Sequence, residues 1–343
     1  KTDNFFYSYV IVAACFSIQA IGVGTYISYG VFFNQLSSEF GWSRATISGA
    51  SSAAFFLMGL LGIFVGRLND RIGPRTVMTV TSSFFGLGLL LMSRLDAIWQ
   101  LYLFYGVIFG IGLSSIDVIA LSTTARWFVK KRGVMTGIVK VGTGMGQLMI
   151  PLAASMLIKS YGWRTSYLII GVAGFLLLVS ITQLLRRDPS QMGLLLNYEK
   201  KMSMDNPGLI RVGLSLHEAV HTRQFWMICA VNLVIVFCLM IIMVHIVPYA
   251  RDIEVSALRA ASVLSTIGGV SMIGRFITGI AIDRIGSKRV IIVCFILLMV
   301  ELLWLQMAND LWMLYLFAVF YGITHGGFFT AISPIVAEFF GIN

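Results

Sequence analysis

Charged residues are scarce in this sequence. Only 12% of its 343 residues are Asp, Glu, Lys or Arg, whereas 58% are hydrophobic. A soluble domain has about 25% charged and about 45–50% apolar residues. The shortage of charge therefore excludes an ordinary soluble protein, and an aromatic content of 13% excludes a disordered chain.

Cysteines and catalytic motifs are also few. The four cysteines lie inside apolar runs without CxxC spacing, so they are expected to be small core side chains. The chain has no GxxxxGK[ST] loop, no HExxH and no GxSxG. These absences argue against ATP-driven transport and against an enzyme, and they predict neither a metal nor a cofactor.

Long apolar segments dominate what remains. Ten are long enough to span a bilayer, and they lack the alternation of barrel strands, which predicts an all-α membrane protein. They cover 7–34, 45–66, 76–93, 98–127, 133–158, 164–185, 224–248, 259–281, 289–307 and 312–339.

The distribution of basic residues predicts the orientation. With the N-terminus inside, 17 of the 25 Lys and Arg residues fall on the cytoplasmic side and six on the other, while Lys140 and Arg275 lie inside spans. This bias predicts a cytoplasmic N-terminus and explains the net charge of +10 without nucleic acid.

One polar stretch, 186–223, reads as a linker between two bundles, 1–185 and 224–343. It holds His217 and His221, which are four residues apart. Without a third ligand, we expect them on a solvated helix face rather than at a metal.

The chain also repeats itself. GRLNDRIGPR (66–75) is echoed by GIAIDRIGSK (279–288), and FYGVIFG (104–110) by FYGITHG (320–326), at offsets of 213 and 216. Internal repeats are typical of transporters that bind substrate between repeats near the bilayer midplane.

GRLNDRIGPR and its echo closely resemble the loop signature of the major facilitator superfamily. The segments YGVFF (29–33), FGWSRATIS (40–48), RWFVKKRGVMTGI (126–138), YGWRTSY (161–167) and RRDPSQMGLL (186–195) resemble its monocarboxylate transporter branch and the oxalate–formate exchangers. The resemblance implies two six-helix bundles, with helices 11 and 12 expected beyond Asn343. One departure is Ser271, where animal members carry an aspartate.

Ionisable groups inside a membrane are costly, so each needs a reason. They are Asp117, Lys140, His245, Arg275, Glu301 and His325. The first two and Arg275 lie at similar depth, about 10–13 Å from the cytoplasmic ends of their segments.

Arg275 is the sharpest candidate for binding substrate. Its planar guanidinium matches a carboxylate, and the segment 274–279 resembles the helix-8 position where oxalate–formate relatives bind substrate. The alternative is an arginine bound to backbone carbonyls or to a structural carboxylate. Lys140 is expected to bind a second anionic group, to pair with Asp117, or both.

The other candidates divide by role. His245 and His325 are candidate pocket residues, His245 and Asp117 are candidate proton carriers, and Glu301 is expected to be structural. Hydroxyl groups for the pocket are expected from Tyr26, Ser114 and Ser271. The gating candidates are Gly66, Asp70, Arg71, Gly73, Asp283 and Arg284, whose aspartates are placed to cap a neighbouring helix.

These features predict a secondary transporter of small carboxylate anions such as lactate, pyruvate, formate or oxalate. It would work by alternating access as a monomer in the cell membrane, coupled to protons. The alternatives are a carboxylate exchanger, a drug-efflux facilitator and a transporter-like sensor that binds solute without moving it.

Overall fold

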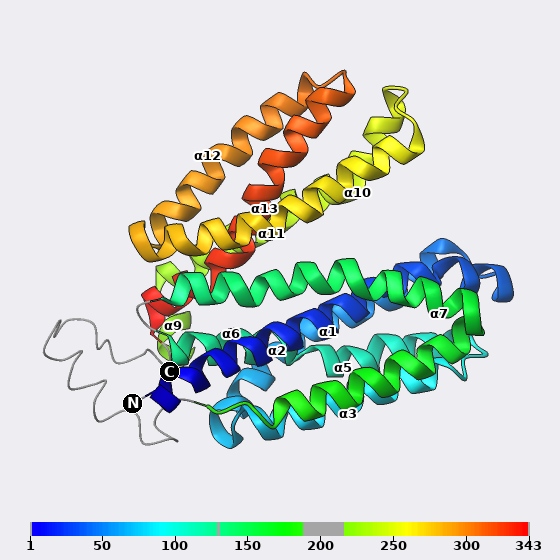
Figure 1. The fold of residues 1–343 in the computed structure, drawn as a ribbon, viewed down its shortest axis with the longest axis horizontal. Helices are drawn as coiled ribbons and strands as arrows, with labels where there is room; N and C mark the ends of the chain where they lie inside the picture. Colours follow the sequence, from blue (N-terminus) through cyan, green and yellow to red (C-terminus); the bar gives the residue numbers. More distant parts are fainter. Residues whose placement is uncertain (1, 129–130, 188–215, 342–343) are drawn as a thin grey trace, which may run out of the picture. The chain divides into compact units, whose positions relative to one another are not determined.

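The computed structural model describes residues 2–128, 131–187 and 216–341, and every regular element in these ranges is a helix (Figure 1). The elements up to residue 127 are α1 (Thr2–Phe40), α2 (Arg44–Ile72), α3 (Pro74–Met92), α4 (Ile98–Leu101), the π-helix η1 (Tyr102–Phe109), α5 (Gly110–Leu113) and α6 (Ile116–Trp127). The later ones are α7 (Arg132–Thr182), α9 (Leu216–Val220), α10 (Arg223–Asp252), α11 (Ala257–Ile285), α12 (Ser287–Gln306) and α13 (Leu311–Phe340).

Nine stretches of described helix are long and apolar enough to cross a membrane. The sequence predicted ten segments, and the difference lies in α7. Its 51 residues would extend about 77 Å, more than twice the thickness of a hydrocarbon core. Gly162, with φ 77° and ψ 165°, interrupts the helix between the predicted segments 133–158 and 164–185. All ten predicted segments therefore fall on helices.

The chain divides into two compact units. Unit 1 comprises Lys1–Trp127 and Met145–Leu195, and unit 2 comprises Phe128–Gly144 and Leu196–Asn343. The start of α7 thus groups with α10 to α13, and the rest of α7 groups with α1 to α6. Most of the predicted linker, 188–215, lies outside the described residues. The domain division at 186–223 stays a prediction.

Small residues bring the helices of unit 1 into close contact. A Cβ added to Gly146 of α7 would lie 2.0 Å from the carbonyl oxygen of Ala20 in α1. One added to Gly112 of α5 would lie 2.4 Å from the backbone nitrogen of Phe85 in α3. Neither separation is sterically possible for a real side chain, so backbone meets backbone at both points, as in small-residue packing of membrane helices.

In unit 2, α11 packs closely against both the start of α7 and α13. An added Cβ on Gly133 would lie 2.4 Å from the Gly279 carbonyl oxygen, and one on Gly326 would lie 2.2 Å from the Ser271 carbonyl oxygen. Around these contacts an apolar core forms from α10 to α13, with Leu239 as one of its fully buried members. The close contacts fix the positions of the side chains that α11 carries.

The sequence repeat is also a structural repeat. Gly73 joins α2 to α3 with φ 86° and ψ 162°, and Gly286 joins α11 to α12 with φ 85° and ψ 152°. L-residues with a side chain rarely adopt such positive φ values, so glycine is required at both turns. The two signature loops therefore reverse the chain in the same way in each unit.

Candidate substrate site

Arg275 is buried inside unit 2. It lies on α11 with 2% of its surface exposed, and its Nη1 donates a hydrogen bond of 2.6 Å to the carbonyl oxygen of Lys140 on α7. Lys140 is 6% exposed. The sequence assigned these residues to different halves of the transporter, but in the structure the start of α7 belongs to the compact unit of α11, and the two residues meet there.

This hydrogen bond is the backbone contact that the sequence kept open as an alternative for Arg275. A carbonyl oxygen and a carboxylate oxygen are both acceptors, and a guanidinium bonds the charged one more strongly. A substrate carboxylate would therefore compete with the Lys140 carbonyl for Nη1. The contact is compatible with either role for Arg275.

Glycines of α7 make this approach possible. A Cβ on Gly144 would lie 3.2 Å from Arg275 Nη1 and 2.4 Å from Met272 Cγ, and one on Gly137 would lie 2.6 Å from the Arg275 carbonyl oxygen. Gly137 therefore packs against the residue that carries the candidate guanidinium.

Two further predicted residues join Arg275 in unit 2. His325 of α13 is 7% exposed and interacts electrostatically with Arg275, and its Nδ1 has no hydrogen-bond partner among the described residues. The next residue, Gly326, packs against the backbone of Ser271 and Arg275. Ser271 donates its hydroxyl hydrogen to the Gly268 carbonyl oxygen at 2.8 Å. The Arg275 side chain therefore interacts with His325 and with the backbone of Lys140, and Ser271 lies one turn before it on α11.

Three predicted residues belong to unit 1 instead. Asp117 Oδ1 accepts a hydrogen bond of 2.6 Å from Nε2 of Gln19 in α1. Ser114 donates to the Ile111 carbonyl oxygen at 2.6 Å, and the Tyr26 hydroxyl accepts from Ser51 at 3.2 Å. Their roles in binding, and the pairing of Asp117 with Lys140, stay predictions.

Gln19 was missed by the sequence analysis. It is fully buried and is a partner of Asp117. The sequence could have pointed to Gln19, because a buried amide in the middle of an apolar run must find a hydrogen-bond partner.

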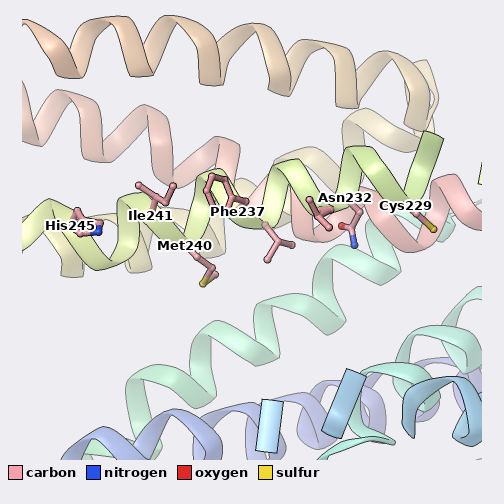
Figure 2. A pocket seen from close by; sticks show the side chains of 8 residues that line it. Cys229, Asn232, Phe237, Met240, Ile241 and His245 are labelled. Carbon is pink, nitrogen blue, oxygen red and sulfur yellow. The ribbon is translucent and has the colours of Figure 1, made fainter. Parts of the chain in front are cut away.

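His245 lies on the exposed face of α10, in an open and mostly apolar depression (Figure 2). All of the lining side chains come from α10, and the polar ones among them are Asn232, His245 and the thiol of Cys229. His245 is thus at a surface of unit 2, whereas His325 is buried within the unit. Its predicted pocket and proton roles stay predictions.

The predicted gating residues lie at helix ends. The Asp283 carboxylate accepts hydrogen bonds from the backbone nitrogens of Gly133 at 2.7 Å and Val134 at 2.9 Å, so it caps the N-terminus of α7. Asp70 instead forms an ion pair of 2.5 Å with Arg126. Arg71 and Arg284 are exposed beside the two aspartates, Gly66 lies within the last two turns of α2, and Gly73 is the turn residue that joins α2 to α3.

No three potential metal-binding side chains (His, Cys, Asp or Glu) come together among the described residues. The ring of His217 on α9 lies 4.8 Å from the ring of His221, which follows the helix in a turn, and His221 Nδ1 contacts the His217 carbonyl oxygen at 2.7 Å. Both side chains are exposed to solvent, but only His217 lies on the helix itself.

Long apolar helices with buried basic groups inside the spans define a polytopic helical membrane protein. The chain belongs to the Major Facilitator Superfamily, whose sequence model matches residues 9–341. Members of this family carry small solutes, often with protons, and are generally not enzymes.

The relatives are transporters. The chain is 26% identical to MFS-type transporter 1 of Ophiocordyceps sp. over 98% of its own length and 72% of that protein. It is 27% identical to monocarboxylate transporter 4 of Mus musculus over 93% of its length and 68% of that protein. The solved proton:xylose symporter XylE matches with a TM-score of 0.68 over 97% of this chain and 82% of that one, and at 14% identity it shows the fold alone.

Proposed function

We propose that this protein is a secondary active transporter of small organic anions that works by alternating access. Its substrates are mono- or dicarboxylates of the size of lactate, pyruvate, formate or oxalate, and it carries them together with protons. It acts as a monomer in the cell membrane with its N-terminus in the cytoplasm. The Lys and Arg asymmetry supports this orientation.

The observation that carries the proposal is the buried Arg275 guanidinium. A cation inside a membrane span costs about 2.5–3.5 kcal/mol on insertion scales, so a function must maintain it. Its Nη1 contacts a carbonyl oxygen that a carboxylate could replace. The similarity to monocarboxylate transporter 4 supports the same substrate class.

Reconstitution of the full-length protein tests this function. A panel of carboxylates, with sugars and apolar drugs as comparison, is screened first by thermal shift. A ligand at 100 times its dissociation constant stabilises by about 2.7 kcal/mol. We expect stabilisation by at least one small carboxylate and its uptake into proteoliposomes when the outside is acidified. Binding without uptake would identify a sensor, and responses confined to apolar drugs would identify an efflux protein.

Lys140 is expected to select for a second carboxylate. A dicarboxylate can contact Arg275 with one end and Lys140 with the other, whereas a monocarboxylate has only one charged group. Lys140→Met should therefore reduce dicarboxylate uptake by about tenfold or more relative to monocarboxylate uptake, equivalent to about 1.4 kcal/mol. Competition between oxalate and formate in proteoliposomes measures the ratio. Equal losses for both anions would mean that Lys140 does not contact the substrate.

A further inference from the structure

Glu301 is a buried carboxyl group in unit 2 that the proposed substrate site does not use. It lies on α12 with 4% of its surface exposed, five residues before the helix ends at Gln306. Its Oε1 accepts a hydrogen bond of 2.6 Å from the Thr324 hydroxyl on α13, while Oε2 has no hydrogen-bond partner among the described residues. One oxygen of this carboxyl is thus held, and the other is enclosed without a partner.

The groups around Glu301 do not neutralise a negative charge. From α13 the polar neighbours are Tyr321 and Thr324, and on α12 itself the Cys294 thiol interacts with it. Tyr321 in turn approaches Cys238 of α10 and donates its hydroxyl hydrogen to the Leu239 carbonyl oxygen.

The buried basic side chains of His325 and Arg275 lie in other contacts. His325 follows Thr324 on α13 but interacts with Arg275 of α11, whose Nη1 donates to α7. Among the described residues, no Lys, Arg or His forms an ion pair with Glu301. An ionised Glu301 would therefore be an uncompensated charge in an apolar core.

Such a charge is strongly unfavourable in a low-dielectric core, and the group avoids it by holding a proton. With Thr324 donating to Oε1, the proton belongs on Oε2. We propose that Glu301 is a proton-binding site of this transporter, and that it takes up the proton that accompanies the carboxylate. This inference rests on the proposed proton-coupled function.

Burial is what suits Glu301 to coupling. A coupling group must exchange its proton with different sides of the membrane in different conformations, so access to it has to change. Glu301 is closed off by the contact between α12 and α13, and separation of Glu301 from Thr324 would expose it. His245, in contrast, is exposed on the surface of α10, so access to it does not depend on a movement of α12 away from α13.

Glu301→Gln tests the proposal without removing the structural contact. The amide oxygen still accepts from Thr324, but the side chain can no longer gain or lose a proton. We expect net uptake to lose its dependence on external pH, so that the ratio of acidic to neutral uptake falls to unity, while exchange of internal for external carboxylate persists. His245→Gln tests the competing candidate for the proton carrier, and Glu254→Gln, the same chemical change at an exposed carboxyl group, is the matched control that should keep the pH dependence of the wild type.

Infrared spectroscopy of the purified protein gives a readout that needs no substrate. A protonated buried carboxyl has a C=O stretching band that an ionised one lacks, and we expect this band in the wild type and in His245→Gln but not in Glu301→Gln. Absence of a difference between wild type and Glu301→Gln would overturn the proton site. If Glu301→Gln loses the band but its uptake keeps the wild-type dependence on pH, the coupling role of Glu301 is overturned. The same conclusion follows if only His245→Gln abolishes the pH dependence of uptake.

Failure of the proposed function would be seen separately. If the wild type transports no carboxylate of the panel, the transport assignment and the coupling role of Glu301 both fall. The infrared band still decides whether Glu301 binds a proton. If uptake occurs but does not depend on pH, carboxylate transport stands and the coupling role is overturned.

Discussion

Replacing Arg275 with lysine is expected to reduce carboxylate uptake by at least about 30-fold, the equivalent of about 2 kcal/mol of lost interaction. The change keeps the positive charge, so long-range attraction of an anion is preserved. It removes the planar fork that binds both oxygens of a carboxylate. Uptake by proteoliposomes with matched amounts of folded protein measures the loss.

The control is Arg289→Lys at the exposed start of α12. It makes the same chemical change outside the candidate site, so uptake should stay at the wild-type level. Near-normal uptake by Arg275→Lys would instead mean that the Lys140 carbonyl is the lasting partner of the guanidinium. In that case Arg275 is a structural link between α7 and α11.

Gly326→Ala is expected to lower the melting temperature of the protein by several degrees or to prevent its folding. The new Cβ would lie 2.2 Å from the Ser271 carbonyl oxygen and 2.8 Å from the backbone nitrogen of Arg275. Because both atoms are backbone, α13 must move away from α11. Overpacking of this kind costs about 1–3 kcal/mol or more.

Gly268→Ala and Gly269→Ala on α11 are the matched controls, because an added Cβ at either position meets nothing within 4 Å. Alanine favours helix over glycine by about 1 kcal/mol, so the melting temperature should be unchanged or slightly raised. Thermal unfolding monitored in detergent distinguishes the three variants. Equal melting temperatures for all of them would contradict the close contact between α11 and α13.

The helices were predictable because apolar runs of this length have few alternatives in a membrane. The interruption of α7 was also anticipated, since the polar residues around Gly162 separate two apolar segments. The sequence did not predict that the start of α7 belongs to unit 2. This membership depends on contacts between residues near Gly133 and Gly279, and nothing in either local sequence specifies the other as its partner.

The sequence predicts the residue types of the candidate site and their depth in the membrane, but it does not predict their hydrogen-bond partners. Arg275 is conspicuous as an arginine in an apolar segment, yet its acceptor is a backbone carbonyl, and every residue of the chain has one. Likewise, the sequence indicates that Asp283 can cap a neighbouring helix, and only the structure shows that the helix is α7. The sequence predicts a structural role for Glu301 because the ninth helix is peripheral in the fold that the resemblance implies. The hydrogen bond of Glu301 with Thr324 and the enclosed Oε2 become visible only when α12 and α13 pack together.

The cap on α7 has a consequence for the timing of biosynthesis. The backbone nitrogen of Gly133 and its acceptor Asp283 are separated by 150 residues. A ribosome adds about 5–20 residues per second, so about 8–30 seconds pass between the synthesis of the helix start and the synthesis of its cap. During that interval α7 enters the membrane with its first backbone N–H groups satisfied by water or lipid headgroups. The start of α7 therefore reaches its final environment only after α11 has been made, long after its own synthesis.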